Sequence, residues 1–97
     1  MENRIERKPE VQLRPVPINL HCARPHARRA FVLADFTRWE PVEMKRRADG
    51  NWLLQVNLVP GNYHYLFLVD GEPQLDPHAT GSVTLDGSGP FSLLTVS

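Results

Sequence analysis

Residues 52–69 read WLLQVNLVPGNYHYLFLV, and this stretch decides the fold class. On both sides of Pro60-Gly61, large apolar residues recur at every second position. Successive side chains of a β-strand point to opposite faces, so this period predicts two strands joined by a turn. The two rows expected to face a core are Trp52, Leu54, Val56 and Leu58 on the first strand, and Tyr63, Tyr65, Phe67 and Val69 on the second.

Similar short runs lie on both sides of this stretch. The other expected strands are residues 16–22, residues 30–34, Val42 and Met44 with the basic run after them, residues 82–85 and residues 91–96. Pro17 favours an edge position for the first run, whereas residues 30–34 are apolar on both faces, as in a central strand. Residues 74–80 are expected to form an irregular connection. About seven short antiparallel strands predict an all-β sandwich of two packed sheets.

The length sets the domain organisation. A chain of 97 residues is expected to form one domain, here from residue 15 to residue 97. Residues 1–14 are mostly charged and polar and predict a disordered or loosely attached tail. A domain of this size buries one modest core and leaves little room for a deep catalytic cleft.

The charges are segregated along the chain. All eleven Lys and Arg residues lie in positions 1–50 beside seven acidic residues, whereas positions 51–97 hold four acidic residues and no Lys or Arg. The residues that could form a small basic face are Arg24, Arg28, Arg29 and Arg38. Scattered solvated charges are the favoured interpretation, so no nucleic-acid partner is expected.

Cellular location is expected to be cytoplasmic. The single cysteine, Cys22, cannot form an intrachain disulfide and reads as a small buried apolar group. No apolar run has the length of a signal peptide or a membrane span, so no membrane partner is expected.

Catalytic and metal chemistry find little support in the sequence. The four histidines, at positions 21, 26, 64 and 78, have no close metal-ligand spacing. Asp70 and Asp76 are more simply turn residues than a carboxylate pair. No nucleophile elbow or phosphate-binding glycine loop is present. We therefore expect no catalytic residues, no metal and no cofactor.

The middle of the chain resembles a known family. Residues 34–39, ADFTRW, follow an apolar strand and are similar to the GDFNxW segment of carbohydrate-binding module family 48. Further matching segments are Pro41, Met44, residues 49–52, residues 58–63, residues 65–71 and Asp76-Pro77. The family includes the glycogen-binding domain of the AMP-activated protein kinase beta subunit and the early-set domains that precede isoamylase and branching-enzyme barrels. The resemblance implies an immunoglobulin-like early-set sandwich that accompanies glycoside hydrolases, with α-glucan (glycogen or starch) as the ligand class.

The resemblance also implies a binding surface. Trp39 matches the family's first sugar-stacking tryptophan, and the same-face neighbours expected for it are Arg38, His64 and Leu66. Three family determinants are replaced: this chain has Leu66 where the family has a lysine, Pro73 where it has a second tryptophan, and Phe91-Ser92 where it has an asparagine.

Two functional hypotheses follow. The first is a non-catalytic α-glucan recognition module with a degenerate sugar site. The second is a protein-interaction or scaffold domain that kept the fold and lost glycan binding. Trp39 is either a sugar platform or a residue packed over the sandwich edge. Leu66 and Leu68 are either an exposed apolar patch or part of the core of the second sheet.

Overall fold

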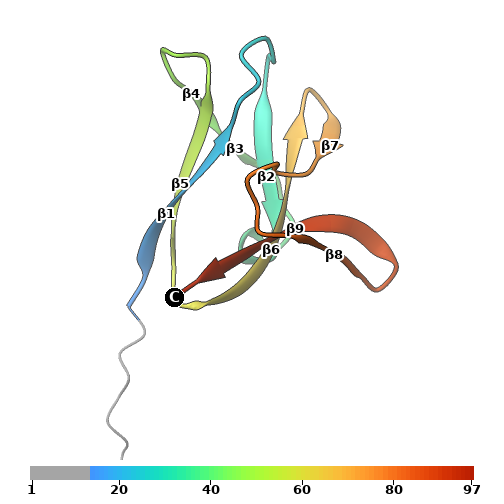
Figure 1. Ribbon diagram of the computed structural model, residues 1–97. Helices are drawn as coiled ribbons and strands as arrows, with labels where there is room; N and C mark the ends of the chain where they lie inside the picture. Colours follow the sequence, from blue (N-terminus) through green and yellow to red (C-terminus); the bar gives the residue numbers. More distant parts are fainter. Residues whose placement is uncertain (1–13) are drawn as a thin grey trace, which may run out of the picture.

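The computed structural model describes residues 14–97, and in this part of the chain two antiparallel sheets pack against each other (Figure 1). The smaller sheet has the strand order β1-β5-β4, and the larger has the order β3-β2-β6-β9-β8, with β7 paired to β6. The strands are β1 Val16–Cys22, β2 Ala30–Ala34, β3 Val42–Glu43, β4 Lys45–Arg46, β5 Trp52–Leu58, β6 Gly61–Val69, β7 Glu72–Gln74, β8 Ser82–Leu85 and β9 Ser88–Val96. A single turn of 3₁₀ helix, η1 at Asp35–Thr37, follows β2. The tail predicted at residues 1–14 lies outside the described residues except for Arg14.

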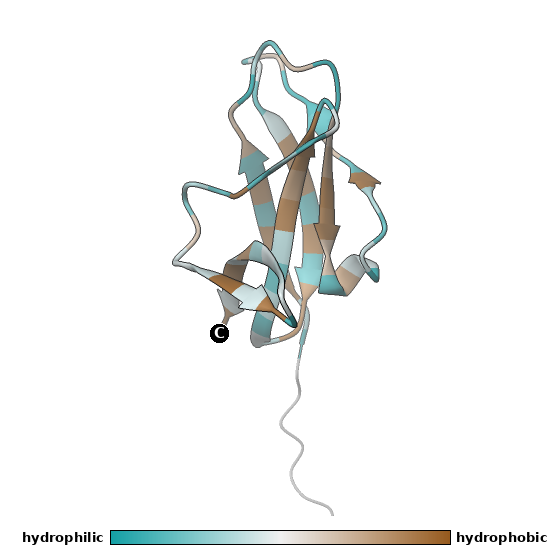
Figure 2. Ribbon diagram, turned by 90° about the vertical axis from the view of Figure 1, so that its right-hand side faces the viewer, coloured by the Kyte–Doolittle hydropathy of each residue, from teal (hydrophilic) through white to brown (hydrophobic). Residues whose placement is uncertain are grey.

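The alternation read from residues 52–69 is confirmed for most members of the two rows, but Val56 and Tyr63, which were also expected to face the core, are only half-buried and lie outside the core cluster. On β6, Tyr65, Phe67 and Val69 are buried, whereas the residues between them are half-buried. On β5, Trp52 and Leu58 are buried at the two ends of the strand. Figure 2 shows the result as apolar and polar bands that alternate along the strands. The period of two residues therefore identifies the faces that pack together.

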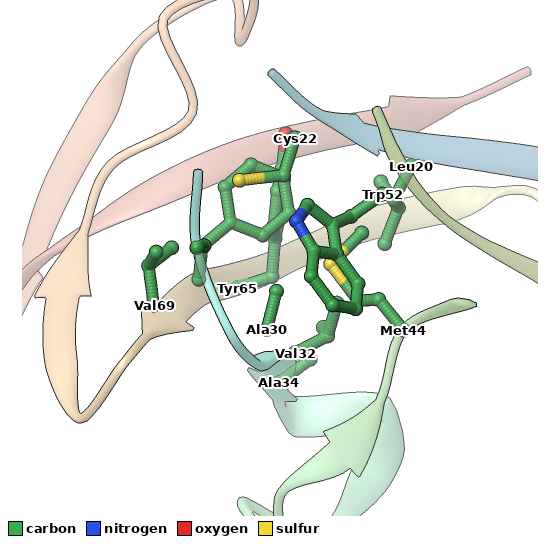
Figure 3. Close-up of a cluster of buried hydrophobic side chains, with 11 residues drawn as sticks. Leu20, Cys22, Ala30, Val32, Ala34, Met44, Trp52, Tyr65 and Val69 are labelled. Atoms are coloured by element: carbon green, nitrogen blue, oxygen red, sulfur yellow. The ribbon is translucent and has the colours of Figure 1, made fainter. Parts of the chain in front are cut away.

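The core lies between the two sheets and draws on both. Its buried members are Leu20, Cys22, Ala27, Ala30, Val32, Ala34, Met44, Trp52, Tyr65, Phe67 and Val69. Figure 3 shows Trp52 and Tyr65 among the smaller side chains of this cluster. The prediction that Cys22 is a buried apolar group is confirmed, and burial raises the pKa of its thiol above the usual value. The edge position of β1 and the central position of β2 are confirmed as well.

The short strand predicted from Val42 into the basic run was wrong as a single element. Residues 42–43 form β3, which pairs with β2 in the larger sheet, and residues 45–46 form β4, which pairs with β5 in the smaller sheet. Met44 lies between them with 2% of its surface exposed, and its N–H donates to the Ala30 oxygen at 2.8 Å. The chain thus crosses from one sheet to the other at a buried residue.

The strand count is also higher than the seven predicted, because nine strands occur in residues 14–97. The division at Met44 adds one. The other is β7, whose three residues pair with the end of β6 just after the turn at Asp70-Gly71. The irregular connection expected at residues 74–80 begins only after Gln74.

One finding bears on membranes. Within residues 14–97, no helix is long and apolar enough to cross a lipid bilayer.

Candidate functional site

The Trp39 loop, residues 35–41, leaves β2 in an unusual backbone conformation. Arg38 and Trp39 both have left-handed φ angles, 58° and 59°. Such a conformation costs a non-glycine residue roughly 1–2 kcal/mol. Several hydrogen bonds hold the loop; among them, the Trp39 N–H donates to the Ala34 oxygen at 2.8 Å, and the Ala34 N–H donates to Thr37 Oγ1 at 3.0 Å.

The loop presents Trp39 to solvent. This residue is 40% exposed, and its ring packs against the ring of Phe91 on β9, with 4.9 Å between the centroids and 47° between the planes. Trp39 is thus partly packed against a neighbour and partly open to solvent, so its burial does not decide between the two predicted alternatives. The sequence predicts Phe91 as the start of the last strand and the replacement of a family asparagine, but nothing in the local spacing indicates that it contacts Trp39.

A shallow apolar groove of about 390 Å³ lies beside Phe91. It is lined by Leu66, Pro73, Leu75, Gly89, Pro90 and Phe91. The three positions at which the family determinants are replaced, 66, 73 and 91, therefore come together in one place. Leu66 and Leu68 are half-buried, so they form neither a fully exposed patch nor a closed core.

A buried hydrogen-bond network holds the wall of this groove that contains Pro73 and Leu75. The Tyr65 hydroxyl donates to Asp76 Oδ2 at 2.5 Å, and the Asp76 N–H donates to Ser92 Oγ at 2.9 Å. Burial, and secondly the hydrogen bond to Asp76, raise the pKa of Tyr65 far above its usual value. Asp76 is therefore more than the turn residue expected from the sequence.

His64 and Asp35 form a polar pair on the same side of the larger sheet as Leu66. Asp35 Oδ2 accepts the backbone N–H of His64 at 3.0 Å and lies 3.0 Å from His64 Nδ1. Both side chains are partly exposed. Arg38, the remaining predicted neighbour, is exposed on the Trp39 loop.

The four arginines weighed as a basic face do not gather in one place. Arg24, Arg28 and Arg29 precede β2, whereas Arg38 follows it, so the first three are separated from Arg38 by the length of this strand. Arg29 pairs with Glu43 at 3.2 Å and stacks on the Phe31 ring. Within residues 14–97, no three metal-ligating side chains gather either.

These features define a class of protein: a small β-sandwich with an exposed aromatic ring and an adjoining apolar groove on one sheet, the architecture of a binding module. The family model described as the glycogen recognition site of AMP-activated protein kinase matches residues 16–92, and the chain belongs to this family. A search of curated proteins finds no match. The resemblance read from the sequence is thereby confirmed.

Proposed function

We propose that this protein is a non-catalytic α-glucan recognition module, and that its sugar platform is the aromatic pair of Trp39 and Phe91. The single observation that carries the proposal is the exposed Trp39 ring on a loop held in a costly conformation. Strained backbone of this kind concentrates at binding sites. An indole offers a flat apolar face to the C–H groups of a sugar ring and an N–H to its hydroxyls.

The groove beside the pair supports binding without catalysis. Leu66, Pro73, Leu75, Pro90 and Phe91 contribute apolar contacts, and none carries a side chain that could act as acid, base or nucleophile. The replaced lysine and tryptophan would remove about 2–4 kcal/mol relative to a site that retains them. A free-energy loss of this size weakens binding by roughly 30- to 1000-fold relative to such a site.

The test is a titration with maltoheptaose and β-cyclodextrin, followed by amide chemical shifts. The wild type should show shifts that cluster at the Trp39 loop and Phe91. Trp39→Ala should abolish them while the other amide signals keep their positions, and Trp39→Phe should retain part of the response because a flat ring remains. Glucan binding that survives in Trp39→Ala would place the site elsewhere.

A second candidate function is recognition of another protein at the same surface. The apolar lining of the groove favours it, because exposed apolar patches commonly mark protein contacts. The same titration separates the two candidates. The absence of any shift at millimolar glucan would contradict the α-glucan proposal and leave the protein-interaction hypothesis.

A further inference from the structure

The Trp39–Phe91 pair and the apolar groove contain few polar groups that could recognise sugar hydroxyls. The lysine of the family is replaced by Leu66, whose side chain cannot form a hydrogen bond. A glucan site nevertheless requires hydrogen bonds, because hydroxyls buried without partners cost free energy. The question is which side chain on this face supplies them.

His64 lies on the required face of the sheet. It precedes Leu66 by two residues on β6, so both side chains point away from the core, opposite the buried Tyr65. Across the sheet, His64 pairs with Leu93 of β9, and Leu66 pairs with Leu33 of β2. Phe91, two residues before Leu93 on the same strand, lines the groove with Leu66. His64 therefore lies two residues from Leu66 on the same face of the sheet, beyond the residues that line the groove.

Asp35 connects His64 to the loop that carries Trp39. Its carboxylate oxygen Oδ2 lies 3.0 Å from both the backbone N and the ring Nδ1 of His64. Its backbone oxygen accepts the N–H of Arg38 at 3.1 Å, within the turn that leads to Trp39. One residue thus fixes the position of the imidazole ring and takes part in the turn that presents the indole.

The hydrogen bond to Asp35 sets the chemistry of the ring. An ionised carboxylate only accepts hydrogen bonds, so Nδ1 must carry the proton that is donated to Oδ2. The neutral imidazole is then left with a free lone pair on Nε2, at the opposite side of the ring from Asp35. A glucan hydroxyl can donate a hydrogen bond to this nitrogen.

Asp35 is not explained by stability alone. Its second oxygen, Oδ1, is buried and has no hydrogen-bond partner among residues 14–97. A buried acceptor without a partner is unfavourable, and such groups call for an explanation beyond packing. The other oxygen, Oδ2, makes both contacts with His64, so the carboxylate is held against the ring although Oδ1 gains no partner there.

We propose that His64 makes the polar contact to the glucan in this site and that Asp35 acts as its positioning residue. The inference rests on the proposed function, since it requires that the Trp39 face binds α-glucan. His64 Nε2 accepts a hydrogen bond from a glucan hydroxyl, and Asp35 fixes the ring and holds the proton of the neutral imidazole on Nδ1. In this chain, the polar contact that a lysine at position 66 makes in the family is thus made by the residue at position 64.

The first test compares maltoheptaose affinities of His64 variants. His64→Phe keeps a planar ring but loses the acceptor, and it should weaken binding about five- to tenfold, as expected for one hydrogen bond. His64→Gln provides an amide oxygen and should recover part of the loss. Arg47→Ala, in the turn that leads to β5, is the matched control and should leave the affinity unchanged. Equal affinities for wild type and His64→Phe would overturn the inference.

The second test observes the ring nitrogens of His64 by ¹⁵N NMR, at a pH where their signals are those of the neutral ring. The wild type should show a protonated Nδ1, and the Nε2 signal should move when maltoheptaose is added. Asp35→Asn places an amide against the ring and should shift the tautomer toward a protonated Nε2, with a matching loss of affinity. A Nε2 signal that stays unchanged at saturating glucan would contradict the direct contact.

The two proposals fail in different ways. If the wild type shows no response at Trp39 to any glucan, the proposed function fails and this inference falls with it. If the Trp39 signals shift and saturate but the His64 variants bind as the wild type does, only the role of His64 is wrong.

Discussion

At the scale of single residues, the Trp39 loop has a strained backbone and exposes an aromatic ring to solvent. Arg38 and Trp39 have adjacent left-handed φ angles, a conformation that glycine adopts at no steric cost. The hydrogen bonds of Trp39 to Ala34 and of Thr37 to Ala34 hold the loop in place. The strain can therefore be relieved at Arg38 without altering the ring of Trp39.

Arg38→Gly should raise the free energy of unfolding by about 0.5–1 kcal/mol, because part of the gain is offset by the larger entropy of the unfolded glycine chain. Urea denaturation at neutral pH measures the difference. Arg38→Ala is the control, since it removes the same charge but keeps the steric cost. Equal stabilities of the Gly and Ala variants would show that the left-handed conformation is not strained.

Tyr65 makes the free energy of unfolding depend on pH in the alkaline range. Its pKa is raised in the folded state by burial and by the hydrogen bond to Asp76, so the fold favours the protonated phenol. The stabilisation is complete below the pKa of an unfolded tyrosine, about 10, and is lost as the pH rises above that value.

Tyr65→Phe should therefore show a flatter decline of stability between pH 9 and 11 than the wild type. At neutral pH the variant should be less stable by about 1–3 kcal/mol, because buried Asp76 loses a hydrogen-bond donor. Urea denaturation at both ends of this pH range tests both effects. Parallel pH profiles for the two proteins would contradict the role given to Tyr65.

The sequence predicted single residues unevenly. Trp39 could be recognised because a motif of six consecutive residues places it. The contact of Trp39 with Phe91 spans 52 positions, and that of Asp35 with His64 spans 29. Such contacts depend on strand register and order, which local spacing does not contain. The sequence therefore named Trp39, Arg38, His64 and Leu66 as candidates, but it did not predict that Trp39 contacts Phe91 or that His64 contacts Asp35.

At the scale of elements, the turns decide where each strand begins. Gly50 precedes β5 with a φ of +87°, and a Cβ added there would lie 2.9 Å from Cβ of Pro25. Gly71, after β6, has a similar φ of +84°, but an added Cβ would meet nothing within 4 Å. Both glycines therefore have a positive φ angle, but a side chain would meet a close neighbour only at Gly50.

Gly71→Ala should cost about 1 kcal/mol, the penalty for a left-handed alanine. Gly50→Ala should cost about 1–2 kcal/mol more, because the β1–β2 loop at Pro25 must also shift. Thermal or urea unfolding of the pair isolates the steric part. Similar losses of unfolding free energy in the two variants would mean that the loop at Pro25 can shift without destabilising the protein.

The sequence predicted where strands occur better than it predicted the sheet to which each strand belongs. The period of two residues identified β1, β5 and β6, and short runs between turns identified β2, β8 and β9. The same period runs through Val42 and Met44, so the pattern could not show that the chain changes sheets between them. Pairing with β2 on one side and β5 on the other decides that division, and both partners are distant in the sequence.

At the scale of the whole molecule, the proposed binding face draws on widely separated parts of the chain. The Trp39 loop follows β2, Leu66 lies on β6, Pro73 on β7 and Phe91 on β9. The larger sheet brings them together, and the core beneath keeps the sheet in place. The sandwich could be predicted from the sequence because each of the two apolar rows must be buried against another sheet. The groove could not, because it depends on how four distant elements pair.

Restoring one replaced determinant should strengthen glucan binding. Leu66→Lys places a charged donor in the groove beside Phe91, and a charge-assisted hydrogen bond is worth about 1.5–3 kcal/mol. We expect at least a tenfold gain in affinity for maltoheptaose by calorimetry or NMR titration. Leu68→Lys, on the same strand face but outside the lining of the groove, is the control and should give no gain. No gain for Leu66→Lys would contradict the assignment of this groove as a sugar site.

The most direct test of the central claim uses the two indole N–H signals of the molecule. Trp39 is exposed on the proposed sugar face, whereas Trp52 is buried in the core and donates its indole N–H to the Arg24 oxygen at 3.0 Å. During a maltoheptaose titration followed by ¹H–¹⁵N NMR, the Trp39 indole signal should move and saturate while the Trp52 signal stays in place. A Trp39 signal that remains fixed at tens of millimolar glucan would contradict the claim that this face recognises α-glucans.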